Sequence, residues 1–285
     1  MKKLHIQTLM VAIICLMLTS CYKKFDPKSY APLFTINGFS TVKEIQPSAL
    51  VAYWAFDGGL ADSVSSTAGT NKGTTFSNGF MGQALTMNAA NKAHMLFDPG
   101  AAITGLKSFT ISFWVNPVFV DVNNDNGIDG VLGLVNLSNT TGFWGNIDWF
   151  VENGSNNSAA IIKAHITSGT KETWVEVKNY PGFFGVWSNH TLTYDAGAST
   201  FRYYINGSVV ATTTAAWTGD IIFTNSGPMV FGCVQFQANP SLGTAGGPQD
   251  WASYLTGSLD EVRIYNTALP ASEINALVVL QGKGK

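Results

Sequence analysis

Few residues in this sequence could act as acids, bases or nucleophiles, and their spacing matches no catalytic motif. Glu172 and Glu176 are four residues apart on one face of an expected strand, with Trp174 between them. Their Cβ atoms would be roughly 13 Å apart, too far for two carboxylates of one strand to act on the same bond. The sequence contains no His-Glu-x-x-His, Gly-x-Ser-x-Gly, phosphate-binding loop or Cys-x-x-Cys motif. It therefore predicts no active site and favours a solvated strand face for the two glutamates. The histidines are scattered along the sequence, and we interpret them as packed or surface residues: His94, His165 and His190.

Aromatic residues in loops rich in Gly and Asn are the best candidates for contacting a ligand. Sugar rings present apolar C–H faces, so Trp side chains surrounded by Asn, Gln and Asp are typical of carbohydrate sites. The loop between residues 237 and 251 has this composition. Exposed aromatic residues also serve protein interfaces, which leaves a protein partner open. The predicted ligand-binding residues are Trp144, Trp149, Trp217, Gln249, Asp250 and Trp251.

One polar loop has oxygen-bearing side chains at positions 1, 3, 5 and 9, a spacing similar to that of EF-hand calcium loops. Its glycine, Gly127, falls one place late, and Leu132 occupies the position of the usual glutamate. Two interpretations therefore stay open, a calcium loop and a polar turn with Asx hydrogen bonds. The oxygen-bearing residues are Asp121, Asn123, Asp125 and Asp129.

The N-terminal residues 1–20 are typical of a signal peptide. Lys2 and Lys3 precede an uncharged apolar run over residues 9–18. This run is too short to span a membrane, which needs about 20 residues. It ends in Leu18-Thr19-Ser20-Cys21, which resembles the lipobox of bacterial lipoproteins. The resemblance implies cleavage before Cys21, a lipid anchor on that cysteine, and a location at the cell envelope, in the outer membrane.

Residues 21–48 predict an extended tether, because they contain three prolines and four lysines and show no regular period. Phe34, Ile36 and Phe39 are more apolar than a linker needs, so part of the segment could pack on the domain that follows. Loss of the signal peptide and lipidation of Cys21 would leave Cys233 alone, in an apolar run that predicts a buried thiol.

Composition excludes several classes of protein. The chain has 285 residues, of which 46% are hydrophobic and 12% charged, with a formal net charge of −2. So apolar a sequence is not a disordered tail. With both signs of charge sparse, the sequence lacks the basic surface expected of a nucleic-acid-binding protein.

From Leu50 onward, short β-forming runs alternate with turns. The run over 109–115 alternates strictly, with its odd-numbered residues on one face, and Asn206-Gly207 is a hairpin signal. One helix is expected directly after Pro270. Many short strands without strand–helix alternation predict an all-β jelly-roll sandwich of two antiparallel sheets, with one short C-terminal helix, over residues 49–281. The expected strands are 50–56, 109–115, 147–152, 160–166, 173–178, 187–194, 200–205, 208–213, 228–236 and 257–265.

Five segments in order along the chain resemble the laminin-G-like domains of the concanavalin A-like lectin/glucanase superfamily. Glucanases on this fold carry a Glu-x-Asp-x-x-Glu strand, and no glutamate here stands in that pattern. The resemblance therefore implies the jelly-roll fold and ligand binding without cleavage. The segments are LVAYWAFD (50–57), GFMGQAL (79–85), FTISFWVNP (109–117), the Trp187–Gly207 hairpin region ending in YING, and GSLDEVRIYN (257–266).

The resemblance also implies a cofactor and a function. Members of this superfamily often hold a structural calcium ion at the rim of the sandwich, and Asp57 and Asp260 occupy the corresponding positions. The alternative is that these residues cap turns or pair with Arg263. The expected function is a lipid-anchored, carbohydrate-binding module of the cell envelope that captures polysaccharide without cleaving it. Two alternatives stay open: an adhesion or scaffold module with a protein partner, and a glycoside hydrolase with carboxylates from unrelated loops.

Overall fold

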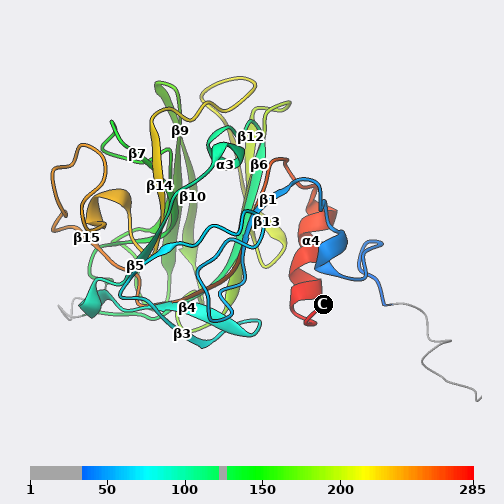
Figure 1. Cartoon of the computed structure of the whole chain (residues 1–285), viewed down its shortest axis with the longest axis horizontal. Coiled ribbons are helices and arrows are strands. Elements are labelled where there is room, and N and C mark those ends of the chain that lie inside the picture. The colour runs from blue at the N-terminus through cyan, green and yellow to red at the C-terminus, as the bar shows by residue number, and fades with distance from the viewer. Residues whose placement is uncertain (1–33, 122–126) are drawn as a thin grey trace, which may run out of the picture. The chain divides into compact units, whose positions relative to one another are not determined.

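The computed structural model describes residues 34–121 and 127–285, and Thr35–Lys285 form one compact unit. This unit is a sandwich of two eight-stranded sheets, which confirms the predicted fold class (Figure 1). Neighbouring strands pair antiparallel, except for one two-residue strand that pairs in parallel. Within the described residues, no helix combines the length and the apolar character needed to cross a bilayer.

The first sheet packs its inner face on the second and carries the C-terminal helix on its outer face. Its strands, in sheet order, are β13 (Ser208–Thr214), β12 (Thr200–Ile205), β11 (Ser188–Asp195), β6 (Phe109–Pro117), β16 (Gly257–Tyr265), β4 (Gln83–Met87) and β3 (Thr75–Asn78), with β1 (Leu50–Trp54) paired to β16.

Most of the strands that the sequence did not predict lie in the second sheet. Several of them are short or rich in polar residues. Its strands, in sheet order, are β10 (Lys171–Tyr180), β9 (Ala160–Ser168), β8 (Ile147–Val151), β7 (Val131–Asn139), β14 (Ser226–Phe231), β5 (His94–Phe97) and β2 (Thr70–Lys72), with β15 (Ala252–Ser253) paired to β7. The helical elements are η1 (Val42–Glu44), η2 (Ala89–Asn91), α3 (Ala101–Thr104), η3 (Gln235–Gln237) and α4 (Ala271–Gln281).

The core lies between the two sheets and is built from the alternating residues of each strand. The odd-numbered residues of β6, Phe109 to Val115, are at most 2% exposed and face the second sheet, as their alternation predicts. Opposite them, the indole of Trp149 lies 4.7 Å from the ring of Phe113 and donates a hydrogen bond to the Tyr203 hydroxyl at 3.1 Å. Large aromatic side chains thus fill the space between the sheets.

Helix α4 covers the outer face of the first sheet together with a segment that precedes β1. It begins directly after Pro270, and its Ile274, Leu277 and Leu280 are buried against Val42 and Ile45. Figure 1 shows η1 beside α4. Residues 35–48 therefore belong to the domain and not to an extended tether, and the packing of Ile36 and Phe39 on it confirms the prediction made from their apolar character. Residues 21–33, with the predicted lipidation site Cys21, lie outside the described residues.

Strand β7 passes so close to a neighbouring backbone that one of its positions accepts only glycine. A Cβ on Gly133 would lie 2.2 Å from the carbonyl carbon of Cys233 and 2.3 Å from the amide nitrogen of Val234. We expect Gly133→Ala to lower the free energy of unfolding by about 3 kcal/mol, because the backbones must move apart. Gly59→Ala is the control, since nothing lies within 4 Å of its added Cβ. Thermal unfolding checks the prediction, and equal losses in the two variants would contradict it.

Candidate functional site

Strand register lines up four side chains across the outer face of the second sheet. Asn136 of β7 lies opposite Asp148 of β8, which lies opposite His165 of β9, which lies opposite Trp174 of β10. Because side chains alternate between the two faces of a strand, these residues point away from the core. The row joins a carboxylate, an imidazole and an indole on one surface of the protein.

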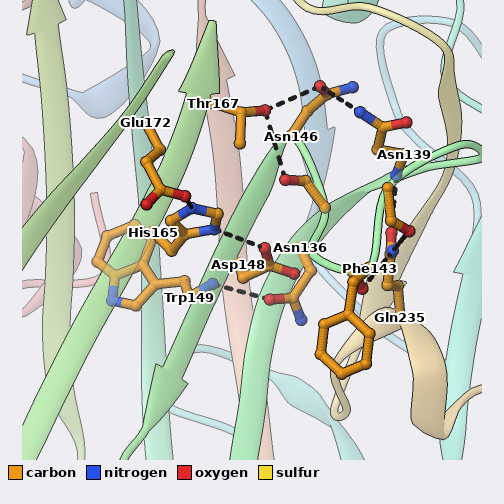
Figure 2. A network of polar contacts seen from close by, with 12 residues as sticks. Asn136, Asn139, Phe143, Asn146, Asp148, Trp149, His165, Thr167, Glu172 and Gln235 are labelled. Atoms are coloured by element: carbon orange, nitrogen blue, oxygen red, sulfur yellow. Dashed lines mark hydrogen bonds and ion pairs between the residues drawn. The ribbon is translucent and has the colours of Figure 1, made fainter. Parts of the chain in front are cut away.

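Two carboxylates hold the imidazole of His165 between them. Its Nδ1 lies 3.2 Å from Asp148 Oδ2 and its Nε2 lies 3.0 Å from Glu172 Oε2 (Figure 2). Asp148 and His165 are buried, whereas 61% of the Glu172 side chain is exposed. The histidine therefore connects a carboxylate inside the protein to one at its surface.

Burial and charge act in opposite directions on His165. Burial disfavours the imidazolium, but the hydrogen bonds and negative charges of Asp148 and Glu172 outweigh it and raise the pKa of His165 above its usual value. A protonated histidine can donate to both carboxylates at once. The two hydrogen bonds thus fix the position of Glu172 on the surface.

Four aromatic side chains gather beside this row, and we call Phe143, Trp144, Trp174 and Trp251 the aromatic face. Phe143, Trp174 and Trp251 are 37%, 36% and 39% exposed, and Trp144 is half-buried among them. The ring of Trp144 lies 6.0 Å from that of Trp174 and 5.9 Å from that of Trp251. Three large rings are thus open to solvent on one surface of the molecule.

A separate apolar cluster on the outer face of the sheet supports these rings. Trp144 stacks on Phe150 of β8, with ring centroids 5.6 Å apart and an angle of 12° between the planes. Trp251 packs against Phe236 at 5.1 Å, and Phe150 and Phe236 belong to a cluster distinct from the core between the sheets. The aromatic face therefore has its own buried base.

Polar contacts fix the loop that carries Phe143 and Trp144. The side-chain amide of Gln235 donates to the carbonyl oxygens of Gly142 and Phe143 at 3.0 and 2.8 Å, and its Oε1 accepts from the Asn139 amide at 2.7 Å (Figure 2). At the other end of the loop, Asn146 accepts a hydrogen bond from the Thr167 hydroxyl. A site supported in this way is preorganised for binding.

Two of the predicted ligand-binding residues belong to the core instead. Trp149 is 0% exposed and faces the first sheet, so the prediction that it contacts a ligand is wrong. Trp217 is 7% exposed and packs 5.7 Å from the rings of Tyr194 and Phe201, so the same prediction for it is also wrong. Both indoles fill space between or beside the sheets, where aromatic burial stabilises the fold.

The structure brings together the remaining predicted residues. Trp144 and Trp251 lie side by side, and Gln249 and Asp250 precede Trp251 in the same loop. The side chain of Gln249 donates to the Gly247 carbonyl, so it shapes the loop, whereas Asp250 is exposed.

Sequence reasoning missed the polar half of this site. The solvated strand face predicted for Glu172 and Glu176 is confirmed, because 61% and 31% of their side chains are exposed, and Trp174 lies between them on the same face. The link of Glu172 to Asp148 through His165 depends on the register between three strands. No local pattern in the sequence specifies that register.

The two carboxylates predicted to bind calcium at the rim accept hydrogen bonds from a turn. Asp57 Oδ1 accepts from the Gln83 amide at 2.7 Å, and Asp260 Oδ2 accepts from the Met81 amide at 2.8 Å. Among the described residues, no group of three or more His, Cys, Asp or Glu side chains could hold a metal ion. Asp57 and Asp260 thus anchor the turn at residues 79–83, as the alternative interpretation predicts, while the buried Oδ1 of Asp260 has no hydrogen-bond partner. Calcium binding at this rim, which could also use carbonyl and water oxygens, stays a prediction.

Calcium binding by the second candidate loop stays a prediction. Asp121 and Asp129 flank residues 122–126, so Asn123 and Asp125 lie outside the described residues. If this loop holds calcium, adding EDTA to protein in calcium buffer should lower the Tm, because the ion binds the folded state only. The Asp125→Ala variant should then lose the effect. An unchanged Tm of the native chain in EDTA would remove the calcium prediction.

Burial raises the pKa of Asp260 to about 7, with the hydrogen bond from Met81 opposing it and the charge of Glu261 adding to it. Since this value exceeds that of the unfolded chain, near 3.9, the contribution of Asp260 to stability is complete below about pH 4 and is lost as the pH rises through 7. We expect Asp260→Asn to keep an acceptor for Met81 and to flatten this decline. Urea unfolding at pH 4.5, 6 and 8 measures the effect, and equal slopes in the two proteins would contradict it.

Comparisons with known proteins agree with the architecture. Residues 89–275, more than half of the chain, match the family model Laminin_G_3, described as the concanavalin A-like lectin/glucanases superfamily. No match was found among curated proteins.

Similar solved structures include two toxin domains and one domain of an enzyme. The binding domain of Paraclostridial Mosquitocidal Protein 1 is 18% identical, with a TM-score of 0.57 over 81% of this chain and 52% of that one. The binding domain of Botulinum Neurotoxin DC in complex with SialylT is 12% identical, with a TM-score of 0.58 over 85% and 52%. Domain 4 of AbnA, a GH43 extracellular arabinanase from Geobacillus stearothermophilus, in complex with arabinotriose, is 19% identical, with a TM-score of 0.51 over 80% and 98%.

The extent of these matches differs between the two kinds of protein. The chain spans about half the length of the toxin binding domains and nearly all of the arabinanase domain. At such low identities the likeness establishes the fold alone. Together with the family match, it leads to one conclusion: the chain belongs to the Laminin_G_3 family of the concanavalin A-like lectin/glucanases superfamily.

Proposed function

We propose that the protein is a non-catalytic, carbohydrate-binding module and that the aromatic face is its binding site. One observation carries the proposal: three aromatic rings, each more than a third exposed, share one surface with the exposed carboxylate of Glu172. The rings can stack on the apolar C–H faces of a sugar, while the carboxylate accepts hydrogen bonds from its hydroxyl groups. A rigid base of buried aromatic side chains keeps these groups in place.

Two solved structures of the same fold support this proposal. The arabinanase domain was determined in complex with arabinotriose, and entry of botulinum neurotoxin type C into cells is described as dependent on two ganglioside molecules. The first ligand is neutral and gangliosides are sialylated, so these structures leave the charge of a ligand open. Another toxin domain was determined with synaptotagmin II, which supports a protein partner as the second candidate.

Asp148 and Glu172 are poorly placed to act together on a glycosidic bond. A glycosidase needs two carboxyl groups that both reach the substrate. Asp148 is fully buried, and the imidazole of His165 separates it from Glu172. This arrangement supports binding without hydrolysis.

We further propose a lipid anchor on Cys21 that holds the module at the outer membrane of the cell envelope. The lipobox resemblance carries this part of the proposal. Replacing Cys21 by Ser should abolish incorporation of labelled palmitate and move the protein from the membrane fraction to the soluble fraction. Unchanged labelling would overturn it.

A glycan array with mass spectrometry of the same wells tests the proposed function. We expect binding of one glycan class without hydrolysis products. Cleavage would show that the protein is an enzyme. If plant, microbial and host glycans all fail to bind, the glycan proposal fails, and a pull-down from envelope extract would then test the protein partner.

A further inference from the structure

The charged groups on and beside the outer face of β8, β9 and β10 are mostly carboxylates. The Nζ of Lys163 lies 2.6 Å from the carboxylate of Glu152 and 3.4 Å from that of Glu176. The Nζ of Lys178 lies 3.1 Å from Glu176. The ammonium groups of Lys163 and Lys178 are thus paired with carboxylates and not with Glu172, and the Nζ of Lys163 also lies 6.0 Å from the centre of the Trp174 ring. Lys171, at the start of β10, is a third ammonium group and is exposed. Four carboxylates (Glu152, Glu172, Glu176 and the exposed Asp250 beside Trp251) against these three lysines leave a formal charge of −1, to which the buried pair of Asp148 and His165 adds no net charge.

Arginine is the side chain best suited to bind a sugar carboxylate, through two parallel hydrogen bonds. The sequence contains two arginines, Arg202 and Arg263. They lie in β12 and β16 of the first sheet, and Arg263 pairs with Glu261 at 2.9 Å. The core of the sandwich separates that sheet from the aromatic face, so no guanidinium reaches the proposed site.

Glu172 presents an oxygen atom to solvent at a defined place. Its Oε2 accepts from Nε2 of His165, and most of its side chain is exposed, so Oε1 remains for a ligand. Trp174 follows two residues later on the same face of β10, which puts the two Cβ atoms roughly 7 Å apart. The rings of His165 and Trp174 lie 4.3 Å apart, so the histidine contacts both residues. A sugar stacked on Trp174 would have hydroxyl groups within reach of the carboxylate.

From this arrangement we infer that the aromatic face selects uncharged sugars and excludes those that carry carboxylates. Glu172 accepts hydrogen bonds from the hydroxyl groups of a neutral sugar stacked on Trp174, and it repels uronic and sialic acids. His165 is a positioning residue that holds Glu172 in place. The inference rests on the proposed glycan binding and adds the class of ligand.

A panel of neutral and anionic oligosaccharides tests the inference. It pairs lactose with 3′-sialyllactose and fully methyl-esterified trigalacturonate with free trigalacturonate, and it includes arabinotriose and neutral plant and microbial oligosaccharides. We expect all bound members to be neutral, with carboxylated partners at least tenfold weaker. Equal or tighter binding of an anionic partner would overturn the inference while leaving the proposed function intact. Failure of the whole panel to bind would overturn the proposed function itself.

Variants at Glu172 give a second test. Glu172→Ala should weaken binding of the best neutral ligand about tenfold, because a hydrogen bond to a charged group is lost. Glu172→Lys should also remove the preference for neutral over carboxylated partners. The matched control is Asp220→Asn, a half-exposed carboxylate that pairs with Lys107 and not with His165, which should change neither property. If Glu172→Lys keeps the preference of the native chain, Glu172 does not set the selectivity.

Discussion

Trp174→Ala is expected to weaken glycan binding about thirtyfold, which corresponds to about 2 kcal/mol, the typical loss when a central aromatic contact is removed from a binding site. The indole is 36% exposed and lies beside the exposed carboxylate of Glu172, so it offers a stacking surface next to a polar anchor. Isothermal titration with the best ligand from the array measures the change.

The effect on folding should be much smaller. Trp174 lies on the outer face of β10 and does not belong to the core between the sheets. We expect the Tm to fall by no more than about 5 °C, which separates loss of the site from loss of the fold. Trp187→Ala is the matched control, because this half-buried indole contacts Phe80 next to the first sheet. Equal losses of affinity in the two variants would place the binding site elsewhere.

The contrast between Trp149 and Trp174 shows what the sequence can predict. Strict alternation in β6 and the hairpin at Asn206-Gly207 are local signals, and they identified strands correctly and with them the sandwich. Trp149 lies in the expected strand 147–152, but the Gly- and Asn-rich loop beside that strand favoured a ligand contact over burial. The alternation of side chains along β8 places Trp149 in the core between the sheets and Phe150 on the outer face of the second sheet.

The polar half of the site could not be predicted, for a different reason. Asp148, His165 and Glu172 come from three strands, and they meet only because Asp148 pairs with His165 while His165 reaches diagonally across the sheet to Glu172. A shift of one residue in either strand pair would turn one of these side chains into the core. Register of this kind depends on the packing of the whole sheet.

Strand β7 was not predicted, because Gly133, Asn136 and Ser138 give its sequence the composition of a loop. The structure requires the glycine, since another backbone passes close to Gly133.

The second large effect is expected at Asp148. Replacing it by Ala should lower the free energy of unfolding by about 3 kcal/mol at pH 5.5, because the buried imidazolium of His165 loses its buried partner. The loss should be smaller at pH 8.5, where the variant can keep His165 neutral at less cost. Urea unfolding at the two pH values measures both losses of unfolding free energy. Asp195→Asn, a change at the half-buried carboxylate that ends β11 and accepts from the Gly197 amide, serves as the control.

The sign of the pH dependence of stability follows from the direction in which the pKa of His165 is shifted. The pKa of His165 is raised in the folded chain, so its contribution to stability is complete below the unfolded value, near 6.5, and is lost as the pH rises through the folded value. Ionisation of Asp260 also lowers the stability as the pH rises, but this effect begins near pH 4. The contribution of His165 is therefore best measured in the Asp260→Asn variant. There, the decline that remains above pH 6.5 should become smaller when Asp148→Ala is added, because Glu172 alone then favours the imidazolium. An undiminished decline in the double variant would mean that His165 gains no proton affinity from Asp148.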